Sequence, residues 1–142
     1  MTTAGYSGTP LAKKLGIKEG TRLTLVRAPE GFESLLSPIP DDVRISRRVG
    51  RGADVIVAFH TSRVRLERDF DRLRAGMHEA GGLWIAWPKR ASGVGTDVTE
   101  DVVREIALAK GLVDNKVCAI DATWSGLRVV VPVANRRRSS WA

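Results

Sequence analysis

The amino-acid sequence predicts a small three-layer α/β domain whose sheet is mostly parallel and ends in an antiparallel hairpin. Residues 53–59 (ADVIVAF) and 83–87 (LWIAW) are almost continuously apolar, which is typical of strands that are covered on both faces. A helical segment follows each of these two runs. Strands that alternate with helices are joined by right-handed crossovers and form a parallel sheet.

The first third of the chain predicts shorter elements. Thr9 as N-cap and Pro10 at the first helical position predict a short helix that ends at Gly16. Branched and leucine side chains then predict a strand at residues 21–28, and a short helix is expected at 30–36. A brief strand is expected at 43–45, after two prolines that break the chain.

An amphipathic helix is predicted to begin after Ser62, its N-cap. Its apolar face comprises Leu66, Phe70, Leu73 and Met77, which recur every three or four residues. Arg65 with Asp69, and Arg68 with Asp71, are expected to form exposed ion pairs on the opposite face. Gly81 and Gly82 are expected to turn the chain into the second buried strand.

A last helix and a hairpin complete the predicted domain. Asp97, followed three residues later by Glu100, predicts a capping box, and Gly111 predicts the end of that helix. Residues 116–120 and 127–131 then predict two strands joined by the loop 121–126. These two strands form the antiparallel hairpin.

Length and composition favour one folded domain. With 142 residues, of which 43% are hydrophobic, the chain is expected to form a single domain over residues 1–134 and a basic flexible tail over 135–142. We expect a cytoplasmic protein, because no signal peptide or membrane span is visible. Cys118 is the single cysteine and lies in an apolar stretch, so a buried structural thiol is expected and a cysteine-based metal site is excluded.

Two arginine-rich stretches can account for the net charge of +7. They are expected to be the contacts for a polyanion, if one binds: Arg44, Arg47, Arg48, Arg51, Arg136, Arg137 and Arg138. No recognition helix carries these arginines, so any nucleic-acid binding is expected to be weak and indifferent to sequence. A solvated loop and a frayed terminus remain the alternative interpretation.

The second half of the chain resembles the latter half of Rossmann-like methyltransferases. The resemblance rests on the strand from Ala53, the helix after it, the segment AGGLWIAW and the closing hairpin. It implies a methyltransferase-like strand order. A narrower resemblance, carried by GYSGTPLAKKLGIK, WPKRASG, TDVTEDVVRE and KVCAIDATWSGL, is to a family of small bacterial proteins with only a domain-of-unknown-function label, and it transfers no residue role.

The cofactor signature of those methyltransferases is missing here. The family binds S-adenosylmethionine with a glycine-rich turn after the first strand and an acidic residue after the second. In this chain the first strand is followed by RAPEGF, and the second by Ser46, Arg47 and Arg48. No cofactor can therefore be assigned, and no catalytic or metal-binding set is predicted at a persuasive spacing.

One candidate pocket remains, at the carboxyl ends of the parallel strands, where open α/β sheets bind ligands. His60 could serve there as a base and Trp124 as a stacking wall, although a lone histidine is more often an ordinary loop residue. The residues expected at this edge are Arg27, Glu30, His60, Ser62, Trp87, Lys89, Arg90, Asp121, Trp124 and Ser125.

The sequence leaves three functional hypotheses open. The leading one is a non-catalytic Rossmann-like binding or adaptor domain with a small-molecule or protein partner. The others are an enzyme with a remodelled small-molecule pocket, which would be a degenerate methyltransferase, and a nucleic-acid-associated protein. No membrane partner is expected.

Overall fold

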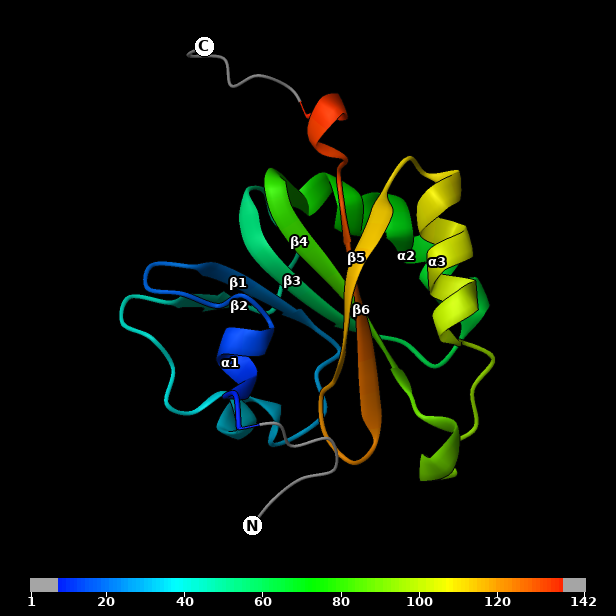
Figure 1. The fold of residues 1–142 in the computed structure, drawn as a ribbon, viewed down its shortest axis with the longest axis horizontal. Helices are drawn as coiled ribbons and strands as arrows, with labels where there is room; N and C mark the ends of the chain where they lie inside the picture. Colours follow the sequence, from blue (N-terminus) through cyan, green and yellow to red (C-terminus); the bar gives the residue numbers. More distant parts are fainter. Residues whose placement is uncertain (1–7, 137–142) are drawn as a thin grey trace.

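A six-stranded, mostly parallel sheet forms the middle layer of the molecule, as predicted (Figure 1). The structure is a computed structural model that describes residues 8–136. The strands lie in the order β2 (Arg44–Ser46), β1 (Arg22–Val26), β3 (Ala53–Phe59), β4 (Met77–Pro88), β6 (Trp124–Val130) and β5 (Val113–Ala119). Neighbours from β2 to β4 pair in parallel, and β6 pairs antiparallel with both β4 and β5.

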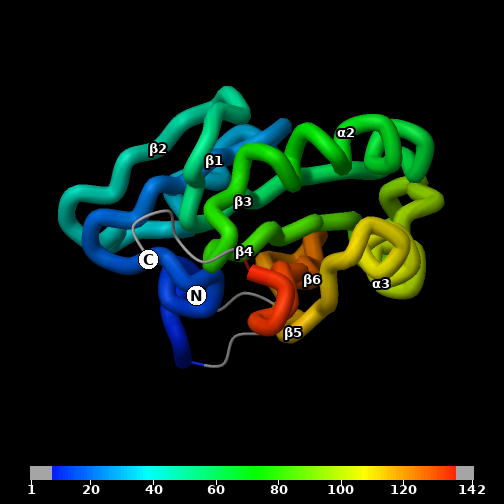
Figure 2. The backbone as a smooth tube through the Cα atoms, turned by 90° about the horizontal axis from the view of Figure 1, so that it is seen from above, coloured from blue at the N-terminus to red at the C-terminus, as the bar shows by residue number. Residues whose placement is uncertain are grey.

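Helices cover both faces of this sheet. The helices α2 (Arg63–Gly76) and α3 (Glu100–Ala109) lie to one side, and the N-terminal segment that carries α1 (Leu11–Lys14) lies to the other (Figure 2). Three 3₁₀ helices complete the described elements: η1 (Phe32–Leu36), η2 (Arg90–Ser92) and η3 (Val133–Asn135). Within residues 8–136, no helix is both long and apolar enough to cross a membrane.

Each face of the sheet packs its own apolar core. On one side Leu66, Phe70 and Leu73 of α2 pack against strand residues that include Ile56. On the other side the α1 segment packs against Leu23 and the central strands. Trp84 of β4 is fully buried on that side, and its Nε1 donates a hydrogen bond of 3.0 Å to the carbonyl oxygen of Leu15. Cys118 is buried in the same core, as expected.

The predicted elements are found, with shifted ends. Pro10 stands at the N-cap of α1 in place of Thr9, and the predicted helix at 30–36 is the 3₁₀ helix η1. Ser62 caps α2 as predicted, by accepting a hydrogen bond from the main-chain N–H of Arg65. The start of β4 was predicted wrongly: Met77 begins this strand and is not the last turn of α2.

The predicted role of Asp97 was also wrong, because this residue caps a different helix. Thr99 is the N-cap of α3, where its hydroxyl accepts from the main-chain N–H of Val102. The Oδ1 atom of Asp97 accepts a hydrogen bond of 2.7 Å from the main-chain N–H of Arg63, the first residue of α2. Asp97 therefore satisfies a free N–H at the start of α2 and ties the loop before α3 to that helix.

Replacing Asp97 with alanine is expected to lower the free energy of unfolding by about 0.5 to 2 kcal/mol, the usual cost of losing a capping side chain. Urea denaturation measures this change. Asp101→Ala is the matched control, because the Asp101 side chain is 93% exposed and its ion pair with Arg104 should contribute little. Equal stability of the Asp97 variant and the wild type would contradict the capping role.

Candidate functional site

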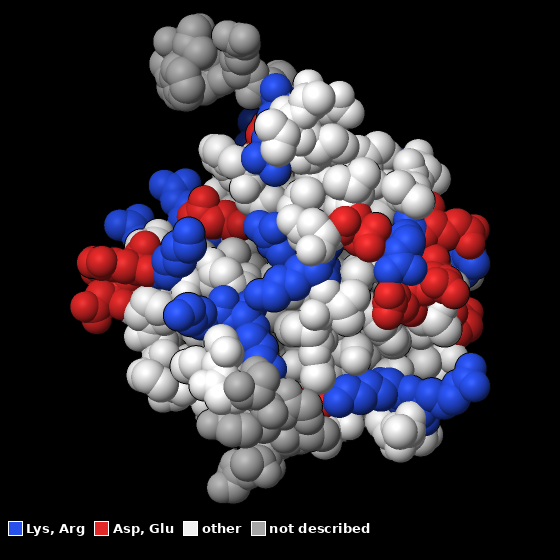
Figure 3. Space-filling view, in the orientation of Figure 1, with Lys and Arg blue, Asp and Glu red and all other residues white. Residues whose placement is uncertain are grey.

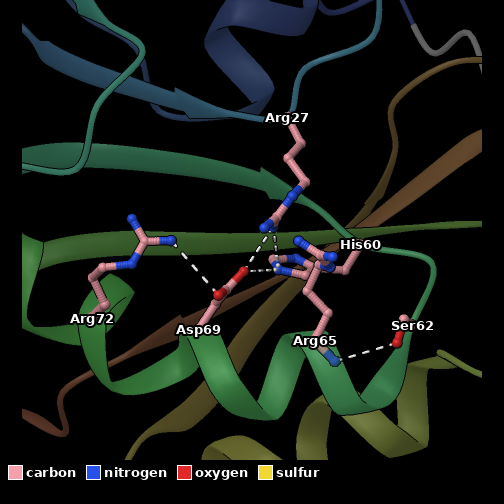
Figure 4. Close-up of polar contacts among 6 residues, drawn as sticks. All are labelled: Arg27, His60, Ser62, Arg65, Asp69 and Arg72. Atoms are coloured by element: carbon pink, nitrogen blue, oxygen red, sulfur yellow. Dashed lines mark hydrogen bonds and ion pairs between the residues drawn. The ribbon is translucent and has the colours of Figure 1, made fainter.

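Three polar side chains meet at the carboxyl ends of β1 and β3 (Figure 4). Arg27 follows β1, His60 follows β3, and Asp69 lies on α2. The Nη1 atom of Arg27 donates a hydrogen bond of 2.7 Å to Asp69 Oδ2. The same atom lies 3.1 Å from His60 Nε2. His60 Nε2 also lies 3.1 Å from Asp69 Oδ2, so each member of this cluster contacts the other two. We call these three residues the Arg27–His60–Asp69 cluster.

Local structure places each member of the cluster. Arg27 has a φ of +56°, a left-handed conformation that non-glycine residues rarely adopt, and it stands at the turn after β1. His60 is held at the end of β3, because its main-chain N–H donates to the carbonyl oxygen of Ala86. Asp69 belongs to α2, where Arg72 lies 3.6 Å from its second carboxylate oxygen.

The cluster lies mostly inside the protein. The side chain of His60 has no exposed surface, that of Asp69 is 9% exposed, and that of Arg27 is 36% exposed. His60 Nδ1 is buried and has no hydrogen-bond partner. A charged imidazole would leave a second N–H unsatisfied there, so the arrangement suits a neutral ring.

Burial and hydrogen bonding set the charge states of the cluster. Burial lowers the pKa of His60, and the hydrogen bond to Asp69 opposes this only in part. Burial alone would raise the pKa of Asp69, but the hydrogen bonds from Arg27 and His60 overcome it and hold that pKa at about 2. At neutral pH the cluster is therefore an ion pair between Arg27 and Asp69 beside a neutral His60.

Aromatic side chains fill the neighbouring part of the same edge. Phe59, the last residue of β3, makes edge-to-face contacts with both Phe32 and Trp124, each with ring centroids 5.0 Å apart. Trp124 is half-buried and packs against the core on this side of the sheet. Trp87 is also buried, with 7% of its surface exposed.

The other predicted pocket residues are dispersed along the edge. Ser62 caps α2, and Asp121 accepts the main-chain N–H groups of Thr123 and Trp124 in the hairpin loop. Ser125 pairs with Trp87 across β6 and β4, and the main chain of Lys89 bonds to Thr123. Glu30 is an exposed residue of the turn before η1.

Two depressions lie beside the cluster at this edge. One of about 480 Å³ is lined by Trp87, Pro88, Arg90 and residues of the loop 93–99. Another of about 390 Å³ is lined by Ala28, Glu30, Arg47 and residues around η1. Neither includes Arg27 or His60 in its lining, so these two depressions do not bring all the predicted residues together.

Sequence reasoning missed Asp69 as a partner of His60. It paired Asp69 with Arg65 on an exposed face, whereas the structure buries the carboxylate against Arg27 and His60. A signal was present, because Asp69 stands three residues after Leu66 and four before Leu73, within the apolar face of α2. A carboxylate at such a position needs a buried partner.

The predicted polyanion contacts separate into groups. Arg44, Arg48 and Arg51 line one depression together with Arg22, whereas Arg47 forms an ion pair with Glu33 near η1. Arg136 follows η3, and its Nε donates to the carbonyl oxygen of Val131 over 3.0 Å. Arg137 and Arg138 lie outside the described residues. The described residues contain no group of three or more His, Cys, Asp or Glu side chains placed to hold a metal ion.

Comparison with solved structures identifies the fold. A S-adenosylmethionine-dependent methyltransferase from Aquifex aeolicus has a TM-score of 0.59 at 14% identity, covering 86% of this chain and 88% of that one. The N-methyltransferase NodS from Bradyrhizobium japonicum WM9 has a TM-score of 0.58 at 14% identity, covering 86% and 92%. An O-methyltransferase of neocarzinostatin biosynthesis, in complex with S-adenosylmethionine, has a TM-score of 0.62 at 12% identity, covering 91% and 51%.

No family model and no curated protein matches the chain, so the narrower resemblance to a bacterial family gains no support from these comparisons. At identities of 8% to 15% the solved structures show a shared fold and not a shared activity. The fold is indicated by the order of the strands, by the antiparallel β4–β6–β5 arrangement and by the structural neighbours. The chain therefore has a methyltransferase-like Rossmann fold.

Proposed function

We propose that this chain is a non-catalytic binding or adaptor domain whose methyltransferase-like fold no longer binds S-adenosylmethionine. The observation that carries the proposal is the position of Arg27. The resemblance places a glycine-rich turn directly after the first strand, where backbone approaches the cofactor closely. Here the left-handed residue after β1 is an arginine whose guanidinium donates to Asp69 and contacts His60.

The surroundings of Arg27 support this proposal. The guanidinium lies across the ends of β1 and β3, and Phe59, Phe32 and Trp124 pack together on the other side of β3. A ligand at these strand ends would have to displace an ion pair and a buried aromatic cluster. The second strand, β2, ends in Ser46 and is followed by two arginines, so no carboxylate is available there for a ribose.

Micromolar S-adenosylmethionine is expected not to bind the full chain, because Arg27 stands where the glycine-rich turn of those methyltransferases approaches the cofactor. Isothermal titration calorimetry tests this directly. In a parallel thermal-shift measurement, a ligand at 100 times its dissociation constant would stabilise the fold by about 2.7 kcal/mol, so real binding would be visible.

Arg27→Gly provides the matching variant, since glycine adopts the left-handed conformation without strain and removes the guanidinium. Binding that appears only in this variant would support Arg27 as the group that fills the edge. A stoichiometric micromolar site for S-adenosylmethionine in the wild type would refute the proposal.

A second candidate function is an enzyme with a remodelled small-molecule pocket. The depression of about 480 Å³ beside Trp87 favours it, because it lies at the carboxyl end of β4 and carries the cation Arg90. A thermal-shift screen of anionic metabolites separates this candidate from the first. A metabolite that stabilises the wild type but not the Arg90→Ala variant would favour the enzyme with a remodelled pocket.

A further inference from the structure

Four arginines surround one depression at the amino ends of the parallel strands. Arg22 of β1 pairs in register with Arg44 of β2, and in a parallel pair such residues point to the same face of the sheet. Leu23, the next residue of β1, packs in the core that contains α1. Because side chains alternate along a strand, Arg22 and Arg44 lie on the opposite face.

The loop from β2 to β3 supplies the other two arginines. Residues 47–52 return the chain to the amino end of β3, and Arg48 and Arg51 join Arg22 and Arg44 around a depression of about 210 Å³. Val49 anchors this loop by packing closely against Gly76 at the end of α2. The contact is so close that a Cβ atom added at Gly76 would lie only 2.5 Å from the Val49 side chain. We call Arg22, Arg44, Arg48 and Arg51 the basic face.

The basic face differs in its ion pairing from the surface formed by α2 and α3. Arg63 bonds to Glu105 at 2.9 Å, Arg104 to Glu100 at 2.6 Å and Lys110 to Asp71 at 2.9 Å. At the right of Figure 3, over α3, acidic and basic side chains accordingly alternate. Among residues 8–136, no ion pair within 4 Å involves a member of the basic face.

Two carboxylates lie near the basic face without neutralising it. Asp54 accepts the main-chain N–H of Arg22, and Asp42 lines a neighbouring depression with Arg22 and Arg44. Neither carboxylate forms an ion pair within 4 Å with the four arginines, all of which are exposed. An excess of exposed arginines on one face is the electrostatic footprint of a polyanion-binding protein.

We propose that the basic face binds the phosphate backbone of nucleic acid. The guanidinium groups come from two strands and a loop, so they can meet several phosphates along a chain. The lining contains no aromatic side chain on which a base could stack, so the contacts are to phosphates and do not depend on sequence. This goes beyond the proposed function, because the basic face lies at the opposite ends of the strands from the Arg27–His60–Asp69 cluster.

Fluorescence anisotropy of a labelled, mixed-sequence RNA strand with the full chain tests the proposal. Four phosphate contacts on a single strand give a slope of log affinity against log salt of about −2.8, so affinity should fall at least tenfold between about 50 and about 200 mM salt. The triple variant R44Q/R48Q/R51Q should bind at least tenfold more weakly at the lower salt, and its slope should be shallower by about 2.

The matched control is K13Q/K18Q/R68Q, which removes the same charge from three other exposed side chains. It should bind within about threefold of the wild type and keep the wild-type slope. Equal losses in the two triple variants would show unspecific charge attraction and overturn the proposal, as would binding that does not respond to salt.

Calorimetry with inorganic pyrophosphate tests the alternative ligand of the basic face, which is a small phosphate compound. Millimolar or weaker binding of pyrophosphate supports a backbone site that needs several phosphates. Stoichiometric micromolar binding that R44Q/R48Q/R51Q abolishes would assign the face to a small phosphate compound and overturn the nucleic-acid proposal. Neither result depends on S-adenosylmethionine, so failure here is distinct from failure of the proposed function.

Discussion

Replacing Asp69 with alanine is expected to lower the free energy of unfolding by about 2 to 3 kcal/mol. The substitution leaves the Arg27 guanidinium and the buried His60 ring without their shared acceptor. Removing one partner of a fully buried pair costs about 3 to 5 kcal/mol. The value here is smaller because the Arg27 side chain is 36% exposed and can regain water.

Asp71→Ala is the matched control for this prediction. It is the same substitution two residues further along α2, so any effect on helix propensity is similar. The Asp71 side chain is 77% exposed and its partner Lys110 is also exposed, so its loss should cost less than about 1 kcal/mol. Urea denaturation of both variants measures the difference, and equal costs would show that the Arg27–His60–Asp69 cluster does not stabilise the fold.

Acidification is expected to destabilise the protein in two steps. The pKa values of His60 and Asp69 are both lowered by folding, so the unfolded chain binds more protons and stability falls as the pH falls. The His60 contribution is present above the ordinary pKa of 6.5 and is lost as the pH falls below it. For Asp69, the drop from an ordinary pKa of 3.8 to about 2 corresponds to about 2 kcal/mol, which is lost between those two values.

Variants of the two histidines of the chain test whether the first loss of stability comes from His60. Urea denaturation between about pH 7 and about pH 5 should show a smaller loss of stability in His60→Gln than in the wild type. His78→Gln is the matched control, because it makes the same substitution at the exposed histidine of β4. A wild-type pH dependence in the His60 variant would show that this ring is not the group that titrates.

Apolar periodicity predicted the centre of the fold well, because burial on both faces leaves a direct trace in the sequence. The strand predicted at 53–59 is β3, residue for residue. Gly81 and Gly82 misled the prediction for the next strand, because glycine was interpreted as a turn residue. In the structure Gly81 lies inside β4, where a Cβ atom would come within 2.8 Å of the Asp54 carbonyl oxygen, so close packing requires glycine there.

The candidate site was less predictable, since its contacts join residues that are far apart in the chain. Arg27 and Asp69 are separated by 42 positions, and Asp97 reaches back 34 positions to the first residue of α2. Local spacing carries no information on such partners. For Asp97 it favoured a cap on the adjacent helix, which the structure contradicts.

The shortness of β2 has a consequence for self-association. This strand of three residues ends the sheet, so its outer main-chain groups could template a second copy of the chain. Arg44 sits within it, and Arg47 and Arg48 follow directly, so two such edges would bring like charges together before many main-chain bonds could form. We therefore expect these arginines to act as gatekeepers against edge-to-edge pairing between two copies of this domain.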